Sequence, residues 1–359
     1  MERLGKISAF QMFSVLLLSR IIALFTFMLP SASYLPSGDR IITTIPVIFI
    51  ELIFTAIVIF CLKYCGSKSI ISAASDISDI FGKLVSVAYA LCFIWFAGIA
   101  VSRFELFIST VMFPNSELYL MTIILLSASF YASLKGIEAI GRASSILSVL
   151  LGASILFILI TVSDEFEFTN LKPLLTQGIT PILRFAFYIS TRAVELITIL
   201  ITAPLVKGNI KRMTTSWVIF FGILTTLILI ILAGVTGEYG DDQIFPLYTL
   251  TVIAKFGIFE RLDDIMSGLW VLCGFIQVSF LIFLSCFSLR QSMKKAKKLP
   301  VCLVCTLGVF GVYLFSSQTV TSFSEIVASF MQDILFVVSA AALPLLITAI
   351  NFIRKKKSA

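Results

Sequence analysis

Four charged residues lie inside long apolar stretches of this sequence, where charge is rare. Arg20 falls near the middle of FSVLLLSRIIALFTFMLP, and Glu51 falls midway along the next apolar stretch. Arg192 and Glu195 stand close together in FAFYISTRAVELITILITAP. A charge at mid-membrane costs roughly 2.5 to 3.5 kcal/mol, so each side chain should face a bundle interior with a partner or water.

Two interpretations of these charges are open. Their positions predict ion pairs, because Glu195 follows Arg192 by one helical turn and Glu51 is the remaining deep carboxylate for Arg20. In the first interpretation, these pairs have a purely structural role and join helices to one another. Alternatively, the four groups line a polar cavity that receives a zwitterion or a proton. A carboxylate that faces a guanidinium stays ionised, which argues against Glu195 as a proton carrier while its pair is intact.

Apolar stretches of roughly twenty residues, at about 1.5 Å rise per residue, match a hydrocarbon core of about 30 Å. We therefore predict an all-α integral membrane protein with ten transmembrane helices, in a single domain over residues 1–359. The first stretch is too long for a cleaved signal peptide. The ten stretches are 10–29, 41–62, 84–103, 118–134, 143–162, 182–203, 215–235, 265–289, 301–317 and 334–353.

The basic residues predict the orientation. If the N-terminus is inside, 19 of the 27 Lys and Arg fall on its side, most densely in RQSMKKAKK and in the C-terminal tail. Arg103 is among the few assigned to the opposite side or its rim. The positive-inside rule then places both termini in the cytoplasm. The net charge of +7 is explained by helix ends that contact anionic lipid, and it does not indicate nucleic acid.

Two long connections predict an internal repeat. Residues 63–83 and residues 236–264 are five spans apart and on opposite faces, as an inverted repeat of five plus five helices would place them. The repeats would cover about 7–162 and 180–353. Spans one and six, which carry Arg20 and Arg192, are then the equivalent central helices.

Composition argues against an enzyme. The chain has no histidine, no nucleotide-binding loop and no pair of accessible carboxylates at a pocket. Cys302 and Cys305 have the spacing of a metal half-site, but no second pair and no histidine complete it, so helix packing is the better interpretation. We expect no catalytic residues, no metal and no cofactor.

Several strings resemble the spore germination permease family, the integral-membrane B subunit of nutrient-germinant receptors and a branch of the amino acid, polyamine and organocation (APC) transporter superfamily. The strings are KISAFQMF, KGIEAIGRASSIL, LKPLLTQGITPILR, VELITIL and IFERLDDIMSGLWVLCGFIQVSFLIF. The resemblance runs from Lys6 to about Phe287. The FERLD string before a tryptophan, together with Gly-Ile-Glu-x-Ile-x-Arg, is fairly specific.

The resemblance implies a LeuT-like fold, residence in the spore inner membrane and partnership with the receptor A and C subunits. It also implies that a small nutrient, commonly an amino acid, is sensed near the midplane where spans one and six are interrupted. The expected ligand-binding residues are Arg20, Ile22, Ala23, Leu24, Phe25, Glu51, Phe96, Tyr188, Thr191, Arg192 and Glu195.

The sequence departs from the family at both central helices. Ala23 stands where relatives commonly have glycine, and SerThrArgAlaVal precedes Glu195 where relatives commonly show proline and glycine. Without such residues we expect unwinding to be more costly than usual. Arg192 would favour an anionic ligand or fill the pocket.

The sequence and the family resemblance together leave three hypotheses for the function. The leading hypothesis is a receptor subunit that senses a small nutrient and triggers spore germination. The alternative is a proton- or sodium-coupled secondary amino acid transporter. A scaffold that has lost ligand binding is the third. Gly98, in the third span, is expected to allow close helix approach rather than ligand contact.

Overall fold

A computed structural model describes residues 5–25, 35–66, 68–113, 118–243, 245–254, 263–293, 296–317 and 322–358 of the chain. The proline that ends the first span, Pro30, and most of the FERLD string lie outside these residues.

Helices dominate the described chain. They are α1 (Ala9–Phe25), α2 (Ser37–Tyr64), α3 (Ile70–Ser75), α4 (Asp79–Phe107), α5 (Leu118–Lys135), α6 (Ile137–Thr161), α7 (Ile179–Ser190), α8 (Val194–Thr202), α9 (Ile210–Thr236), α10 (Pro246–Ile253), α11 (Asp263–Ser292), α12 (Lys298–Ser317), α13 (Ser322–Val337) and α14 (Leu343–Ser358). A π-helical turn, Ile108–Met112, extends α4, and another, Val338–Ala342, joins α13 to α14.

Short elements connect these helices. The strands β1 (Ile7–Ser8) and β2 (Val206–Lys207) pair in parallel, with Ile7 opposite Val206. This pairing joins the segment before α1 to the segment after α8. The 3-10 turns are Ser163–Glu165, Phe168–Leu171, Ala203–Leu205 and Gly237–Asp242.

The helices have the length and polarity of membrane spans, so the protein is a multi-pass membrane protein. Eight spans in the described chain are long and apolar enough to cross a bilayer, and the shorter apolar helices Ala9–Ile22 and Tyr119–Lys135 coincide with the first and fourth predicted stretches. The count of ten transmembrane helices stays a prediction. Large apolar side chains such as Phe49 and Ile160 are exposed on outer helix faces, as lipid contact requires.

The predicted central helices are among the most buried of the described chain. In the span Ile179–Leu205, 83% of the apolar window lies inside the protein, against 22% for Lys298–Ser316. In α1, side chains on every face of the helix are buried, including Met12, Leu16 and Leu18. A helix that is buried all round belongs at the centre of a bundle.

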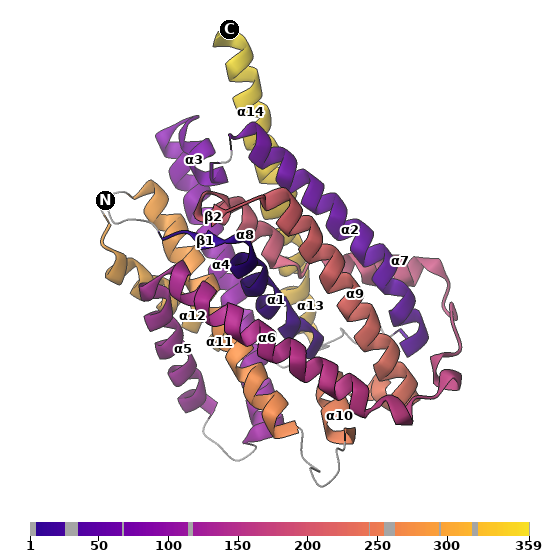
Figure 1. Ribbon diagram of the computed structural model, residues 1–359. Coiled ribbons are helices and arrows are strands. Elements are labelled where there is room, and N and C mark those ends of the chain that lie inside the picture. Colours follow the sequence, from indigo (N-terminus) through magenta and orange to yellow (C-terminus); the bar gives the residue numbers. More distant parts are fainter. Residues whose placement is uncertain are drawn as a thin grey trace.

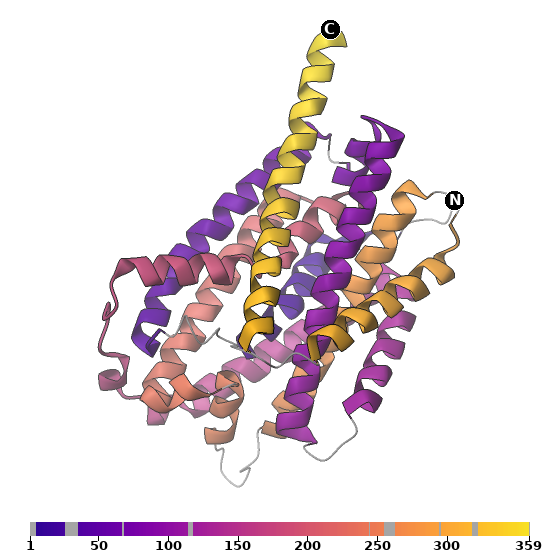
Figure 2. The same cartoon turned by 180° about the vertical axis from the view of Figure 1, so that it is seen from behind.

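The two long connections lie at opposite ends of the molecule, as predicted. Figure 1 shows α3 at the end that also holds the β1–β2 pair, and α10 at the other end. Seen from behind, α14 projects past the other helices at the end where α3 lies (Figure 2).

Gly98 lets α4 approach α12 closely, as predicted. A Cβ atom at this position would lie 2.4 Å from Cγ1 of Val312 and 3.2 Å from the backbone nitrogen of Tyr313. Small residues serve this purpose between membrane helices because they let backbones approach.

Candidate ligand site

The most buried span is interrupted at its middle. Helix α7 ends at Ser190 and α8 begins at Val194, and between them Ala193 has φ −80° and ψ 57°, which is outside the helical region. The span is thus unwound although it lacks glycine and proline here, which we expected to make unwinding more costly than usual. For span one, α1 is continuous to Phe25, and the residues that follow lie outside the described chain.

Arginine side chains explain how this break is stabilised without glycine or proline. The carbonyl of Tyr188 accepts a hydrogen bond from Arg192 Nη1 at 2.5 Å. The carbonyl of Ile189 accepts one from Arg20 Nη2, on α1, at 3.1 Å. Irregular backbone at membrane depth is tolerated where such groups satisfy the freed carbonyls. The Arg192 guanidinium and the Thr191 hydroxyl thus replace the backbone donor that the Tyr188 carbonyl loses. The Ile189 carbonyl keeps a backbone donor, the Arg192 N–H at 3.2 Å, and gains Arg20 as a second donor.

The predicted pairing of Arg20 with Glu51 is confirmed. Arg20 Nη2 lies 2.9 Å from Glu51 Oε1, and both side chains are only 3% exposed. The pair joins α1 to α2. Because Arg20 also caps the Ile189 carbonyl, it connects α1, α2 and the helix break at a single buried point.

The predicted pairing of Arg192 with Glu195 is wrong. Arg192 Nη1 pairs instead with Asp333 Oδ1, on α13, at 2.6 Å. The break between the two residues removes the helical register that would have stacked them. Glu195 accepts a hydrogen bond from Ser19 Oγ, on α1, at 2.8 Å.

Tyr188 and Thr191 hold Arg192 in place. The guanidinium carbon lies 3.3 Å from the centre of the Tyr188 ring, a cation–π contact. The hydroxyl of Thr191 accepts from Arg192 Nη1 at 2.6 Å and lies 2.5 Å from Asp333 Oδ1. Both predicted residues therefore act on the orientation of Arg192.

A small cavity lies beside the break and collects five of the eleven predicted site residues. Arg20, Ile22, Phe96, Arg192 and Glu195 line it. The centre of a water molecule can reach about 20 Å³ of it, room for about one water. The side chains of Ala23, Leu24 and Phe25 lie outside the described part of the structure. Their predicted roles stay predictions.

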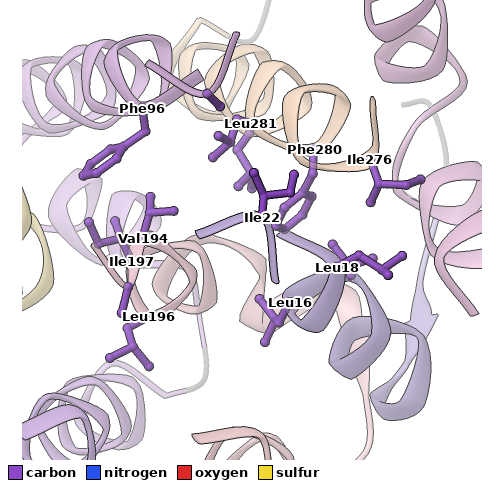
Figure 3. Close-up of a cluster of buried hydrophobic side chains, with 14 of the residues drawn as sticks. Leu16, Leu18, Ile22, Phe96, Val194, Leu196, Ile197, Ile276, Phe280 and Leu281 are labelled. Carbon is purple, nitrogen blue, oxygen red and sulfur yellow. The ribbon is translucent and has the colours of Figure 1, made fainter. Parts of the chain in front are cut away.

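The apolar wall of the cavity comes from four elements. Figure 3 shows Ile22 from α1, Phe96 from α4, Val194 from α8 and Leu281 from α11 around this region. A binding site that combines an apolar wall with a few polar groups is typical for small molecules.

Several lining residues were not predicted. Ser19, Arg103, Gln277 and Gln332 face the same cavity, and Asp333 lies behind Arg192. Arg103 had been assigned to the outer side or its rim because its apolar stretch ends there. The helix instead continues through the π-helical turn to Met112, which places Arg103 well inside the span. The mixed sequence SRFELFISTVMF, with more apolar residues after Arg103, was the available signal.

Some buried polar atoms of the site have hydrogen-bond partners and others have none. Among the described residues, Arg20 Nε and Nη1, Arg192 Nε and Nη2, and Glu195 Oε2 are buried without a hydrogen-bond partner. A buried polar group left in this state costs about 1 to 3 kcal/mol. Water or a small polar molecule that supplies acceptors and one donor would satisfy these atoms.

Solved structures confirm the predicted LeuT-type transporter fold. The chain is similar to Mhp1, a nucleobase-cation-symport-1 family transporter, in a closed conformation with bromovinylhydantoin bound, with a TM-score of 0.59 at 12% identity over 96% of this chain and 78% of Mhp1. It is also similar to a Na⁺-coupled sialic acid symporter in a substrate-bound outward-open state, with a TM-score of 0.58 at 12% identity over 95% and 78% of the two chains.

Relatives at the sequence level include spore germination proteins of two Bacillus species. Spore germination protein KB of Bacillus subtilis (strain 168) is 28% identical over 67% of this chain. Spore germination protein XB of Bacillus anthracis is 26% identical over 54% of this chain. The matched region spans 66% of the first relative and 56% of the second. The sequence profile of the spore germination protein family matches residues 6–326, and the chain therefore belongs to this family.

Proposed function

We propose that this chain is the integral-membrane subunit of a spore nutrient-germinant receptor, which senses a small nutrient such as an amino acid and triggers germination. The observation that carries this proposal is the interrupted span at Thr191–Ala193, whose flanking arginines line a buried polar cavity. Membership of the spore germination protein family supports the biological role. We infer no catalytic activity and no cofactor.

The proposal includes a cellular setting. The protein resides in the spore inner membrane with both termini in the cytoplasm, and it assembles with the receptor A and C subunits. The distribution of Lys and Arg supports this orientation. The end that holds α3 and the C-terminal helix is then the cytoplasmic end.

Secondary transport is the second candidate, because the two similar solved structures are symporters. A transporter must open both faces of its site in turn, whereas a receptor needs only two states that differ in ligand affinity. The break is tied to α2 through Arg20–Glu51 and to α13 through Arg192–Asp333. Two ion pairs around one small cavity favour a sensor over a site that opens freely to both sides.

Two measurements test the proposed function. Spores that lack this chain should lose their germination response to at least one component of a nutrient mixture, and the native gene should restore it. Arg184 is an exposed arginine on α7, in the same span as Arg192. Restoration by Arg184→Gln but not by Arg192→Gln would therefore place sensing at the break. An unchanged response without the chain would contradict the receptor role.

The second measurement separates sensing from transport. Purified protein in liposomes should bind a nutrient in a thermal-shift assay without accumulating it under imposed proton or sodium gradients. Robust gradient-driven accumulation of any one amino acid would instead establish the transporter.

A further inference from the structure

The cavity beside the helix break carries an excess of hydrogen-bond donors. Its buried unpaired atoms are four guanidinium nitrogens, from Arg20 and Arg192, against a single carboxylate oxygen, Glu195 Oε2. Gln277 and Gln332 contribute one donor group and one acceptor group each, and so leave this imbalance unchanged. A complementary ligand must therefore be rich in acceptor oxygens and carry one donor.

The free atoms of Arg192 have the geometry of a carboxylate receptor. Nη1 is occupied by Tyr188, Thr191 and Asp333, while Nε and Nη2, which form one edge of the guanidinium, have no partner in the described chain. Two parallel N–H groups on one edge bind a carboxylate in a bidentate manner, which a lysine cannot do. The contacts on Nη1 hold this edge in a defined orientation.

A third guanidinium faces the same cavity. Arg103 lines it, and no carboxylate of the described residues forms an ion pair with Arg103. Arg20 and Arg192 already have carboxylate partners in Glu51 and Asp333. Three guanidiniums but a single carboxylate, that of Glu195, line the cavity, so the like charges repel one another. An anionic group on the ligand offsets this repulsion in a region where charge is costly.

We propose that the site takes an acidic amino acid, a ligand with two carboxylates and one ammonium group. One carboxylate binds the free edge of Arg192, the second binds Arg103, and the ammonium group donates to Glu195 Oε2. This proposal rests on the proposed function, since it names the class of nutrient sensed at the same site.

The cavity must enlarge to admit such a ligand, because about 20 Å³ holds only about one water. The Asp333 side chain is 28% exposed, whereas the side chain of Arg192 is 6% exposed. A ligand carboxylate at Arg192 competes with Asp333 for the same guanidinium, and Asp333 is the more exposed of the two partners. Its release adds space and leaves one positive charge for the anionic ligand to balance.

Thermal shift of the full-length protein in nanodiscs tests the ligand class. The probes are L-glutamate and L-aspartate, with L-glutamine and L-asparagine as amides of matched size that lack the second charge. We expect a saturable stabilisation by at least one acid at concentrations about tenfold or more below those that its amide requires, because hydrogen bonds to charged groups are the stronger ones. Succinate, which lacks the ammonium group, should also bind more weakly than L-aspartate.

Variants then assign the second carboxylate. Arg103→Gln should remove the preference for the acid over its amide, whereas Arg184→Gln, an exposed arginine on α7, should leave the preference unchanged. Arg192→Lys keeps the charge but removes the pair of N–H groups that binds a carboxylate in a bidentate manner, so it should weaken binding of acid and amide alike.

Some outcomes overturn the proposal even if a variant fails to fold, because the first comparison uses only the native protein. An amide that stabilises the native protein as well as its acid contradicts the ligand class. So does the absence of stabilisation by every probe, which would leave an internal water only. In either case, a germination response that still depends on this chain shows that the receptor role survives while the ligand class fails.

Discussion

Arg192 donates to Asp333 across 141 positions of the sequence and so ties the interrupted span to α13. A π-helical turn carries α13 directly into α14. At the middle of α14, Asn351 Nδ2 donates to the carbonyl of Ala73, on α3. The Arg192–Asp333 contact is thus connected through continuous helix to the end of the molecule that holds α3.

The first prediction concerns this contact. Arg192→Gln and Asp333→Asn should each lower the apparent melting temperature in detergent, because each leaves a charged group without its partner. The double variant should lose less than the sum, with a coupling in the lower part of roughly 0.5 to 3 kcal/mol because Asp333 is partly exposed. Strict additivity in the double-mutant cycle would show that the two side chains do not interact.

The second prediction concerns the buried pair Arg20–Glu51. Glu51→Gln should be strongly destabilising, by about 3 to 5 kcal/mol, because it strands a guanidinium in the membrane interior. Arg20→Met combined with Glu51→Leu should recover part of this loss, although the Ile189 carbonyl then keeps only its backbone donor, the Arg192 N–H. Melting temperature and protein abundance report both effects.

A matched control for this pair is Lys68–Asp76, at 2.8 Å, whose side chains are 57% and 55% exposed. Asp76→Asn should leave the melting temperature nearly unchanged, since exposed pairs contribute little. If Asp76→Asn and Glu51→Gln were equally harmful, burial would not be the cause of the difference.

The third prediction concerns helix packing at Gly98. Gly98→Ala should destabilise the protein by roughly 1 to 3 kcal/mol, because the added methyl group meets Val312 at 2.4 Å. The control is Gly152→Ala in α6, where a Cβ atom meets nothing within 4 Å. That change should be neutral or slightly stabilising, since alanine favours helix more than glycine. Equal melting temperatures for the two variants would refute close packing at Gly98.

The fourth prediction concerns orientation. In a background without the seven native cysteines, all of which are buried, Asp164→Cys should react with a membrane-impermeant maleimide from outside intact cells, and Lys297→Cys should not. Both positions are exposed. Asp39, although also assigned to the outside, is unsuitable because it is buried against residues 175–177. Reaction of Lys297→Cys from outside would reverse the proposed topology.

Much of the architecture could be predicted from the sequence. Each apolar stretch reflects a local requirement, about twenty residues to cross the hydrocarbon core, and the two long connections were placed at opposite ends. The Arg20–Glu51 pair could also be predicted, because a deep charge in a membrane needs a partner and few candidates exist. The family resemblance, carried by short strings, was confirmed by the sequence profile.

The break in the sixth span could not be predicted from its own residues. Local propensity indicates that a span without glycine or proline stays helical. The carbonyl freed at Tyr188 is nevertheless satisfied by the side chains of Arg192 and Thr191, and Arg20 adds a donor at the Ile189 carbonyl. Arg20 belongs to another helix. The backbone conformation at the break therefore depends on a residue of another helix as well as on the residues of the span itself.

The sequence by itself determined that this protein is a bundle of membrane helices with charges at its centre, because hydropathy is summed along a single stretch of chain. Only the tertiary structure decided which charges meet. Asp333, rather than Glu195, pairs with Arg192, and Arg103 faces the cavity rather than the rim. The physical reason is that an ion pair depends on the distance between two atoms, and the packing of helices far apart in the sequence sets that distance.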